Sequence, residues 1–282
     1  MMKPMHASRC GDLATQYLDM RAPRSRAFFY GVCALLFAVC AAATVVACGS
    51  MSTMDDMPMP GGWAMSMTWM PMCGRSWPGV AARFVGMWVV MMIAMMLPSL
   101  APVLWRYDEA LRRAGHARAA LMTLLAGVGY FAVWAALGTA LFVFGATLAA
   151  LVMRMPAVSR VVPIVAGVIV LSAGALQITA LKARYLHCCR HAAQSGLHAL
   201  PARAVAAIRY GVRLGVHCCA CCASLTAVLA VTGVMDLRAM AAVTAAITLE
   251  RVAPHGEFIA RVIGFLVIGA GLFMIVRAAS LV

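Results

Sequence analysis

The chain has 282 residues, of which 64% are hydrophobic and only 11% are charged. Soluble domains are about half apolar and about a quarter charged, so this composition excludes an ordinary cytosolic enzyme and a disordered chain. An integral membrane protein remains. The chain also carries 23 Met, 11 Cys and a formal charge of +14. That is more sulfur than packing alone usually requires.

Apolar runs long enough to cross a bilayer follow one another along the chain. A crossing helix needs about 20 residues, so the runs predict an all-α, polytopic transmembrane helix bundle of six or seven helices. No polar turn interrupts residues 119–153, and we therefore predict one tilted helix there rather than two. The predicted spans, including a short one at 238–252, are 27–48, 80–104, 119–145, 161–181, 212–235, 238–252 and 259–279.

The basic residues indicate how the chain is oriented. With seven crossings and a cytoplasmic N-terminus, 17 of the 23 Lys and Arg fall in segments predicted to face the cytoplasm, which are 1–26, 105–118, 182–213 and 250–261. This positive-inside pattern predicts a multi-pass protein of the bacterial inner membrane. It favours contact with the lipid bilayer over nucleic acid. The predicted domains are a basic cytoplasmic tail at 1–26 and a transmembrane domain at 27–282, with a Met-rich outer loop at 49–79.

The first apolar run allows a second interpretation. Its end, Val45 to Cys48, resembles a bacterial lipoprotein cleavage box. The charged leader of 26 residues before the run is long for a signal peptide, so we predict a retained helix. An intact-mass measurement separates retention from processing.

The loop after the first run is rich in methionine. Eight Met lie between Met51 and Met72, and Pro58, Pro60 and neighbouring Gly disfavour a helix or a packed strand. Thioethers are neutral, soft ligands that suit Cu(I) or Ag(I). The loop therefore predicts capture of such an ion at the outer face. The alternative is an interfacial loop whose Met and Trp side chains dip into the lipid headgroups.

A second group of methionines lies in the predicted span 80–104. Met91 and Met95 are four residues apart, as are Met92 and Met96, so each pair stacks on one helical face. Pro98 removes a backbone hydrogen bond just beyond them, which in a membrane often opens a ligand position. Core packing is the simpler explanation of these Met taken alone.

The segment from His217 to Cys222 carries the strongest chemical signal, with four Cys and one His in six residues. On a helix, Cys218, Cys221 and Cys222 project to one side and His217 lies beside Cys221. Such a face offers thiolates and an imidazole to one ion, or a dithiol able to form a disulfide. One buried Cys is usually a packing residue, whereas this density, including Cys219, indicates a metal-binding cluster.

Two further groups have balanced alternatives. The run His187-Cys188-Cys189-Arg190-His191 is either a cytosolic landing site for metal or a basic interfacial segment. Glu250 is a functional candidate as an intramembrane carboxylate, or it only ends a short helix beside Arg251. At about 1.5 Å per residue, Met95, the Cys/His cluster and Glu250 all reach the inner half of the bilayer. Gln177 and Lys182 would complete a ring around them.

Short motifs occur in a fixed order along the chain: Trp88, Met91, Ala94-Met95-Met96-Leu97-Pro98, Gln177, Leu181-Lys182, Cys189-Arg190, Gly215, Cys218, Cys221-Cys222, Gly233-Val234-Met235 and Leu249-Glu250. This series, covering about 80–271, resembles the bacterial family described as predicted metal-binding integral membrane proteins, sometimes labelled copper-chaperone-like. The resemblance implies an all-helical inner-membrane protein that binds metal. The chain departs from the family pattern at Tyr185, Ala223 and Thr226.

The sequence thus predicts an inner-membrane protein that binds a soft metal ion, Cu(I) rather than zinc, for metal homeostasis, transfer or delivery. A periplasmic metal donor or a metalloenzyme acceptor would be its partner. A membrane oxidoreductase using Cys-x-x-Cys thiols or a bound metal is the alternative, so enzyme activity stays open, and sulfur used only for packing is a third interpretation. No catalytic residue is assigned. The candidate metal residues are His217, Cys218, Cys219, Cys221, Cys222, Met91, Met95, Met96 and Glu250, the last as charge partner or proton acceptor.

Overall fold

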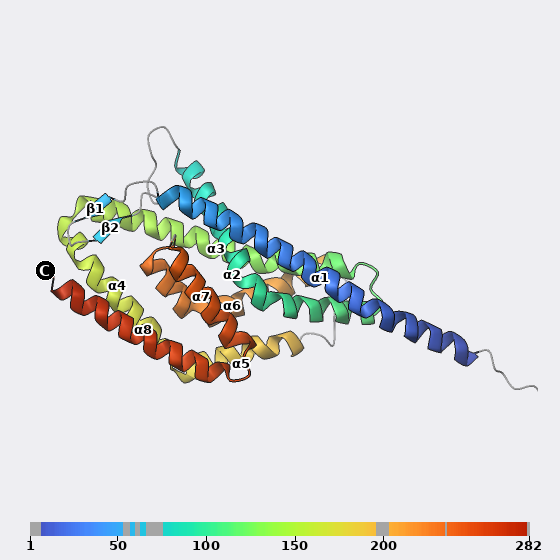
Figure 1. Ribbon diagram of the computed structural model, residues 1–282. Helices are drawn as coiled ribbons and strands as arrows, with labels where there is room; N and C mark the ends of the chain where they lie inside the picture. The colour runs from blue at the N-terminus through green and yellow to red at the C-terminus, as the bar shows by residue number, and fades with distance from the viewer. Residues whose placement is uncertain are drawn as a thin grey trace, which may run out of the picture.

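A computed structural model describes residues 7–52, 57–59, 63–65, 76–195, 203–234 and 236–280. In these residues the helices are α1 (Ala7–Ser52), α2 (Trp77–Arg113), α3 (Ala119–Arg154), α4 (Pro156–Gln177), α5 (Ala180–Ser195), α6 (Ala204–Thr232), α7 (Leu237–Val252) and α8 (Gly256–Ala279), and β1 (Met57–Met59) and β2 (Trp63–Met65) form a hairpin. Six of the described helices, α1 to α4, α6 and α8, are long and apolar enough to cross a membrane. The predicted all-α polytopic bundle is confirmed, and α7 is the short seventh run (Figure 1).

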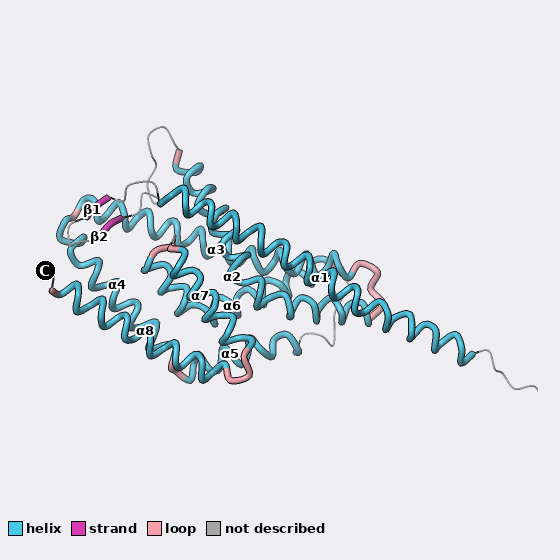
Figure 2. The backbone as a smooth tube through the Cα atoms, in the orientation of Figure 1, coloured by secondary structure: helices cyan, strands magenta, loops and turns pink. Residues whose placement is uncertain are grey.

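The order of the helices in space follows the alternation expected of a chain that crosses back and forth. Figure 1 shows the C-terminus, the hairpin and the turn between α3 and α4 at one end of the bundle. At the other end lie α5 and the turn between α7 and α8. Figure 2 shows how little of the described chain lies outside helices. The hairpin, the turn between α3 and α4 and the C-terminus, which are all predicted to be outside, therefore lie at the same end.

The turns between helices follow from particular residues. The apolar run 119–153 forms one helix, as predicted, and only Met155 separates α3 from α4. Met155 is extended, with φ −130° and ψ 93°, because the following Pro156 disfavours helical geometry before it and suits the first position of a helix. Gly233, with φ 124°, ends α6, and the Asp236 carboxylate accepts backbone hydrogen bonds at the start of α7.

The predicted end of the fourth span is wrong. The apolar pattern predicts a span at 161–181, but α4 ends at Gln177 and α5 begins at Ala180. The Thr179 hydroxyl lies between the two helices, where it donates to the Leu176 carbonyl at 2.6 Å and accepts from the Lys182 amide at 3.4 Å. It thus satisfies one backbone group from each helix end. Lys182 consequently belongs to α5.

Helices α3 and α6 approach each other so closely that their contact surfaces require glycine. A Cβ atom added to Gly211 of α6 would overlap the Ala126 carbonyl oxygen of α3. One added to Gly129 of α3 would lie 2.5 Å from a backbone oxygen of α6. Small residues allow this kind of approach between helices in membranes. The contact brings Tyr130 of α3 against Cys218 of α6.

This contact predicts the effect of adding one methyl group. The change Gly211→Ala should destabilise the folded protein by about 1–3 kcal/mol, because the new methyl meets backbone rather than a movable side chain. Gly269→Ala is the matched control, since no atom lies within 4 Å of its Cβ position. The control should be neutral or stabilising by up to about 1 kcal/mol through helix propensity. Unfolding of the detergent-solubilised variants measures both, and equal stability would contradict this account.

Candidate metal site

The centre of the bundle holds a cluster of three sulfur atoms from two helices. Cys218 and Cys222 are one turn apart on α6 and are 2% and 1% exposed. The Cys218 thiol lies 4.0 Å from the Met96 thioether of α2, and Met96 is fully buried. Two thiols and one thioether thus meet in an apolar interior. We call these three residues the sulfur site.

The donors of the sulfur site suit a soft ion, and the distance between two of them agrees with a trigonal arrangement. Thiolate and thioether together select Cu(I) over hard cations. Metal–sulfur bonds of about 2.3 Å in a trigonal arrangement would place the sulfur atoms about 4.0 Å apart. The distance between Cys218 and Met96 matches this value. Among the described residues, His, Cys, Asp and Glu alone provide no group of three able to hold a metal ion, so a three-donor site here needs the thioether.

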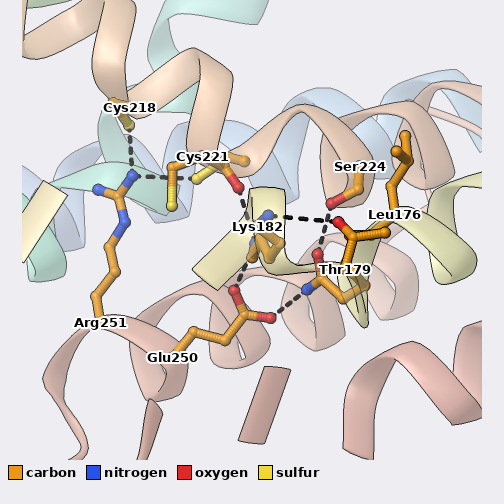
Figure 3. A network of polar contacts seen from close by, with 10 residues as sticks. Leu176, Thr179, Lys182, Cys218, Cys221, Ser224, Glu250 and Arg251 are labelled. Carbon is orange, nitrogen blue, oxygen red and sulfur yellow. Dashed lines mark hydrogen bonds and ion pairs between the residues drawn. The ribbon is translucent and has the colours of Figure 1, made fainter. Parts of the chain in front are cut away.

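Two polar side chains from other helices contact the thiols. The Tyr130 hydroxyl of α3 lies 2.8 Å from the Cys218 sulfur. One guanidinium nitrogen of Arg251, in the last turn of α7, donates to both Cys218 and Cys222, at 3.0 and 3.2 Å (Figure 3). The other terminal nitrogen donates to the Ser99 hydroxyl of α2 at 3.3 Å. The thiols are therefore held between a cation and a hydroxyl.

A second polar network lies beside the sulfur site. Lys182 of α5 pairs with the Glu250 carboxylate of α7 at 2.8 Å, and Gln177 of α4 donates to the other oxygen of the same carboxylate. Ser224 of α6 donates to Gln177 at 2.6 Å. Lys182 also donates to the Cys221 carbonyl at 2.8 Å, which joins this network to the backbone of the Cys segment (Figure 3). Four helices thus meet through buried hydrogen bonds.

The structure separates the predicted metal residues into groups. Cys218, Cys222 and Met96 come together, whereas Met91 and Met95 lie buried elsewhere in the same core cluster. Met95 and Cys222 both belong to this core cluster, so neither faces away from the other across lipid.

The remaining candidates lie around that cluster. Cys221 is buried, its thiol contacts that of Cys222, and its carbonyl accepts from Lys182. His217 and Cys219 occupy half-buried positions of α6. Glu250 points to Lys182 and Gln177, as the predicted ring requires, while its neighbour Arg251 points to sulfur. These contacts show that Glu250 does more than end a short helix beside Arg251.

The Met-rich loop is described in part. The statement that Pro and Gly disfavour strands there is wrong for β1 and β2, which pair antiparallel with Met57 opposite Met65 and Met59 opposite Trp63. Pro58 fits because both strands of a two-stranded hairpin are edge strands. Alternate residues and directly paired residues share a face, so Met57, Met59 and Trp63 lie on one face. The Trp63 indole donates to the Ser159 carbonyl at 3.0 Å, which attaches the hairpin to α4.

Several predicted features fall beyond what the structure describes. Met54, Met67, Met70, Met72 and Cys73 of the Met-rich loop lie outside the described residues, as does Met235 of the motif series. The side chains of residues 188–191 are also outside the description, so the landing-site alternative stays a prediction.

The sequence left two residues of the site unrecognised. Tyr130 lies in an unbroken apolar run, and its hydroxyl is the feature that could have indicated a polar contact there. Arg251 enters the sequence prediction only as a neighbour of Glu250. Its signal was a cation placed near the end of an apolar segment, which requires a partner inside the protein.

Comparisons with known proteins agree with this donor chemistry. A family model described as copper chaperone, PpoB2, matches residues 85–274, which is more than half of the chain. Neither the curated proteins nor the solved structures include a match. The match includes the whole sulfur site and confirms the copper-chaperone-like resemblance seen in the motif series. The chain therefore belongs to the PpoB2 copper chaperone family.

Proposed function

We propose that this protein is a multi-pass carrier of the bacterial inner membrane, with a cytoplasmic N-terminus, that binds Cu(I) as cargo and delivers it to another protein. Cys218, Cys222 and Met96 are the ligands. The observation that carries this proposal is the 4.0 Å contact between the Cys218 thiol and the Met96 thioether, with Cys222 one turn away. The copper chaperone family supports it independently.

Loading of the sulfur site exchanges protons for copper. One Cu(I) binds to both Cys as thiolates, and each thiol that is still protonated releases its proton to solvent. Thiolates are the metal-binding form of cysteine. The Arg251 guanidinium contacts both sulfur atoms, so it is placed to stabilise their negative charge. The Tyr130 hydroxyl can donate to Cys218 in the same state.

The hairpin supports capture at the outer end of the bundle. Met57 and Met59 share a face with Trp63, and all three are half-buried. Two neutral thioethers beside an aromatic face suit a soft cation that must be bound weakly and passed on. Figure 1 places the hairpin at the end of the bundle with the C-terminus. The buried Met91 and Met95 of α2 lie in the core cluster that contains the sulfur site, and they extend a path toward it.

The first test removes the two thiols. The double change Cys218→Ser and Cys222→Ser should weaken Cu(I) binding by roughly 100-fold or more, equivalent to about 2.7 kcal/mol or more. Competition with a chromogenic Cu(I) chelator, under reducing and anaerobic conditions, measures the affinity. Cys33→Ser with Cys40→Ser is the matched control, because these two thiols lie on α1 away from the sulfur site. Wild-type protein that binds no Cu(I) would refute the proposal.

The second test isolates the thioether. Met96→Leu should weaken Cu(I) binding about tenfold, which corresponds to about 1.4 kcal/mol. Met92→Leu is the control, since both Met are fully buried on α2 and both changes conserve volume. Each variant should therefore keep its fold while only the first loses affinity. If both bind Cu(I) like the wild type, Met96 is not a ligand.

The third test concerns the hairpin. Met57→Leu with Met59→Leu should slow Cu(I) loading about tenfold at limiting copper and leave the equilibrium affinity of the sulfur site unchanged, because capture precedes final binding. Stopped-flow mixing of Cu(I) with protein in nanodiscs gives the rate. Met153→Leu with Met155→Leu, two exposed Met at the same end of the bundle, is the control. Equal loading rates would exclude a capture role.

A further inference from the structure

Within the described part of the chain, Arg251 is the charged side chain that donates hydrogen bonds to the sulfur site, and its contacts are specific. A single guanidinium nitrogen donates to Cys218 and Cys222, and the other terminal nitrogen donates to Ser99. Among the described residues, the Nε atom of Arg251 is buried and has no hydrogen-bond partner. The guanidinium thus donates more of its described hydrogen bonds to the thiols than to any other group (Figure 3).

The neighbouring charges are paired with each other, and Arg251 directs two hydrogen bonds to the sulfur atoms. Lys182 and Glu250 form an ion pair at 2.8 Å, and Gln177 completes the hydrogen bonds of that carboxylate. Tyr130, which contacts Cys218, and Ser99, which accepts from Arg251, are neutral hydroxyls. Cys221 adds a third thiol beside Cys222, which is neutral in the charge count that follows. The charge of the sulfur site then depends on the two thiols of Cys218 and Cys222, one guanidinium and the bound ion.

Counting these charges separates monovalent from divalent ions. Two thiolates and Cu(I) carry a net charge of −1, which the guanidinium brings to zero. Two thiolates with a divalent ion are already neutral, so the guanidinium adds an uncompensated positive charge. A buried charge without compensation is strongly unfavourable in a low-dielectric interior. Repulsion between the guanidinium and the ion also doubles with the charge of the ion.

We propose that Arg251 makes the sulfur site selective for monovalent over divalent soft ions through this charge balance. The inference rests on the proposed function, because it assumes that the sulfur site binds Cu(I). It goes further because it assigns the selectivity between monovalent and divalent ions to a residue that is not a ligand. Arg251 is thus a specificity-determining residue that acts on the ion by charge rather than by a bond.

The test compares ions and variants in the purified full-length protein. Affinities for Cu(I), Ag(I), Zn(II) and Cd(II) are measured by chelator competition, anaerobically, for wild type, Arg251→Gln and Arg251→Lys. We expect the ratio of Zn(II) to Cu(I) affinity to rise about tenfold or more in the Gln variant, because that variant removes one buried positive charge that repels the ion. The Lys variant keeps the charge and should stay near the wild-type ratio. Arg277→Gln, at an exposed position in the last turn of α8, is the control.

Wild-type protein gives a second, mutation-free measurement. Cd(II) is soft but divalent, and its intrinsic preference for sulfur differs from that of Ag(I), so the ratio of Ag(I) to Cd(II) affinity is compared with the ratio for a short peptide that carries two Cys and one Met and no cation. Selection by charge predicts a ratio at least about tenfold higher in the protein than in the peptide, whereas selection by the donors alone predicts equal ratios. This comparison decides the question even when Arg251→Gln fails to fold. Equal ratios in protein and peptide, or an unchanged ion ratio in a folded Gln variant, would overturn the role of Arg251 alone. Absence of Cu(I) binding in wild type would overturn the proposed function as well.

Discussion

Charged groups inside an apolar bundle must have partners, and this requirement organises the centre of the protein. Glu250 and Arg251 are adjacent in α7 and therefore point about 100° apart around the helix. One side chain meets Lys182 and Gln177, and the other meets the two thiols. The rotation of α7 is thereby fixed between two sets of partners. Because the Lys182 ammonium also holds the Cys221 carbonyl, the same pairing positions the Cys segment of α6.

The helices were largely predictable because length and hydrophobicity are local properties of a membrane span. All seven predicted runs correspond to helices, including the single helix over residues 119–153. The boundary at α5 was missed because it depends on a two-residue break and on the Thr179 hydroxyl, neither of which changes the apolar pattern. The hairpin was missed for a similar reason, since cross-strand pairing compensates for residues that disfavour isolated strands.

The site was predictable only where helix geometry alone brings residues together. Cys218 and Cys222 are neighbours because they are four positions apart on one helix. The sequence could not choose Met96 over Met91 or Met95, since the choice depends on how α2 is rotated against α6, which the whole core determines. Arg251 contacts thiols 33 and 29 positions away, so its role depends on the placement of α7.

A carrier must release its cargo, and the unequal donors of the sulfur site suit such release. In the proposed function, two thiolates hold Cu(I) while the third donor, Met96, is a neutral and weaker ligand. An incoming thiolate from an acceptor could replace the thioether and keep three sulfur donors around copper throughout the exchange. Arg251 contacts the two Cys sulfur atoms, so its charge stabilises the ligands that would leave later. The arrangement therefore favours stepwise transfer from sulfur to sulfur over release of a free ion into the bilayer interior.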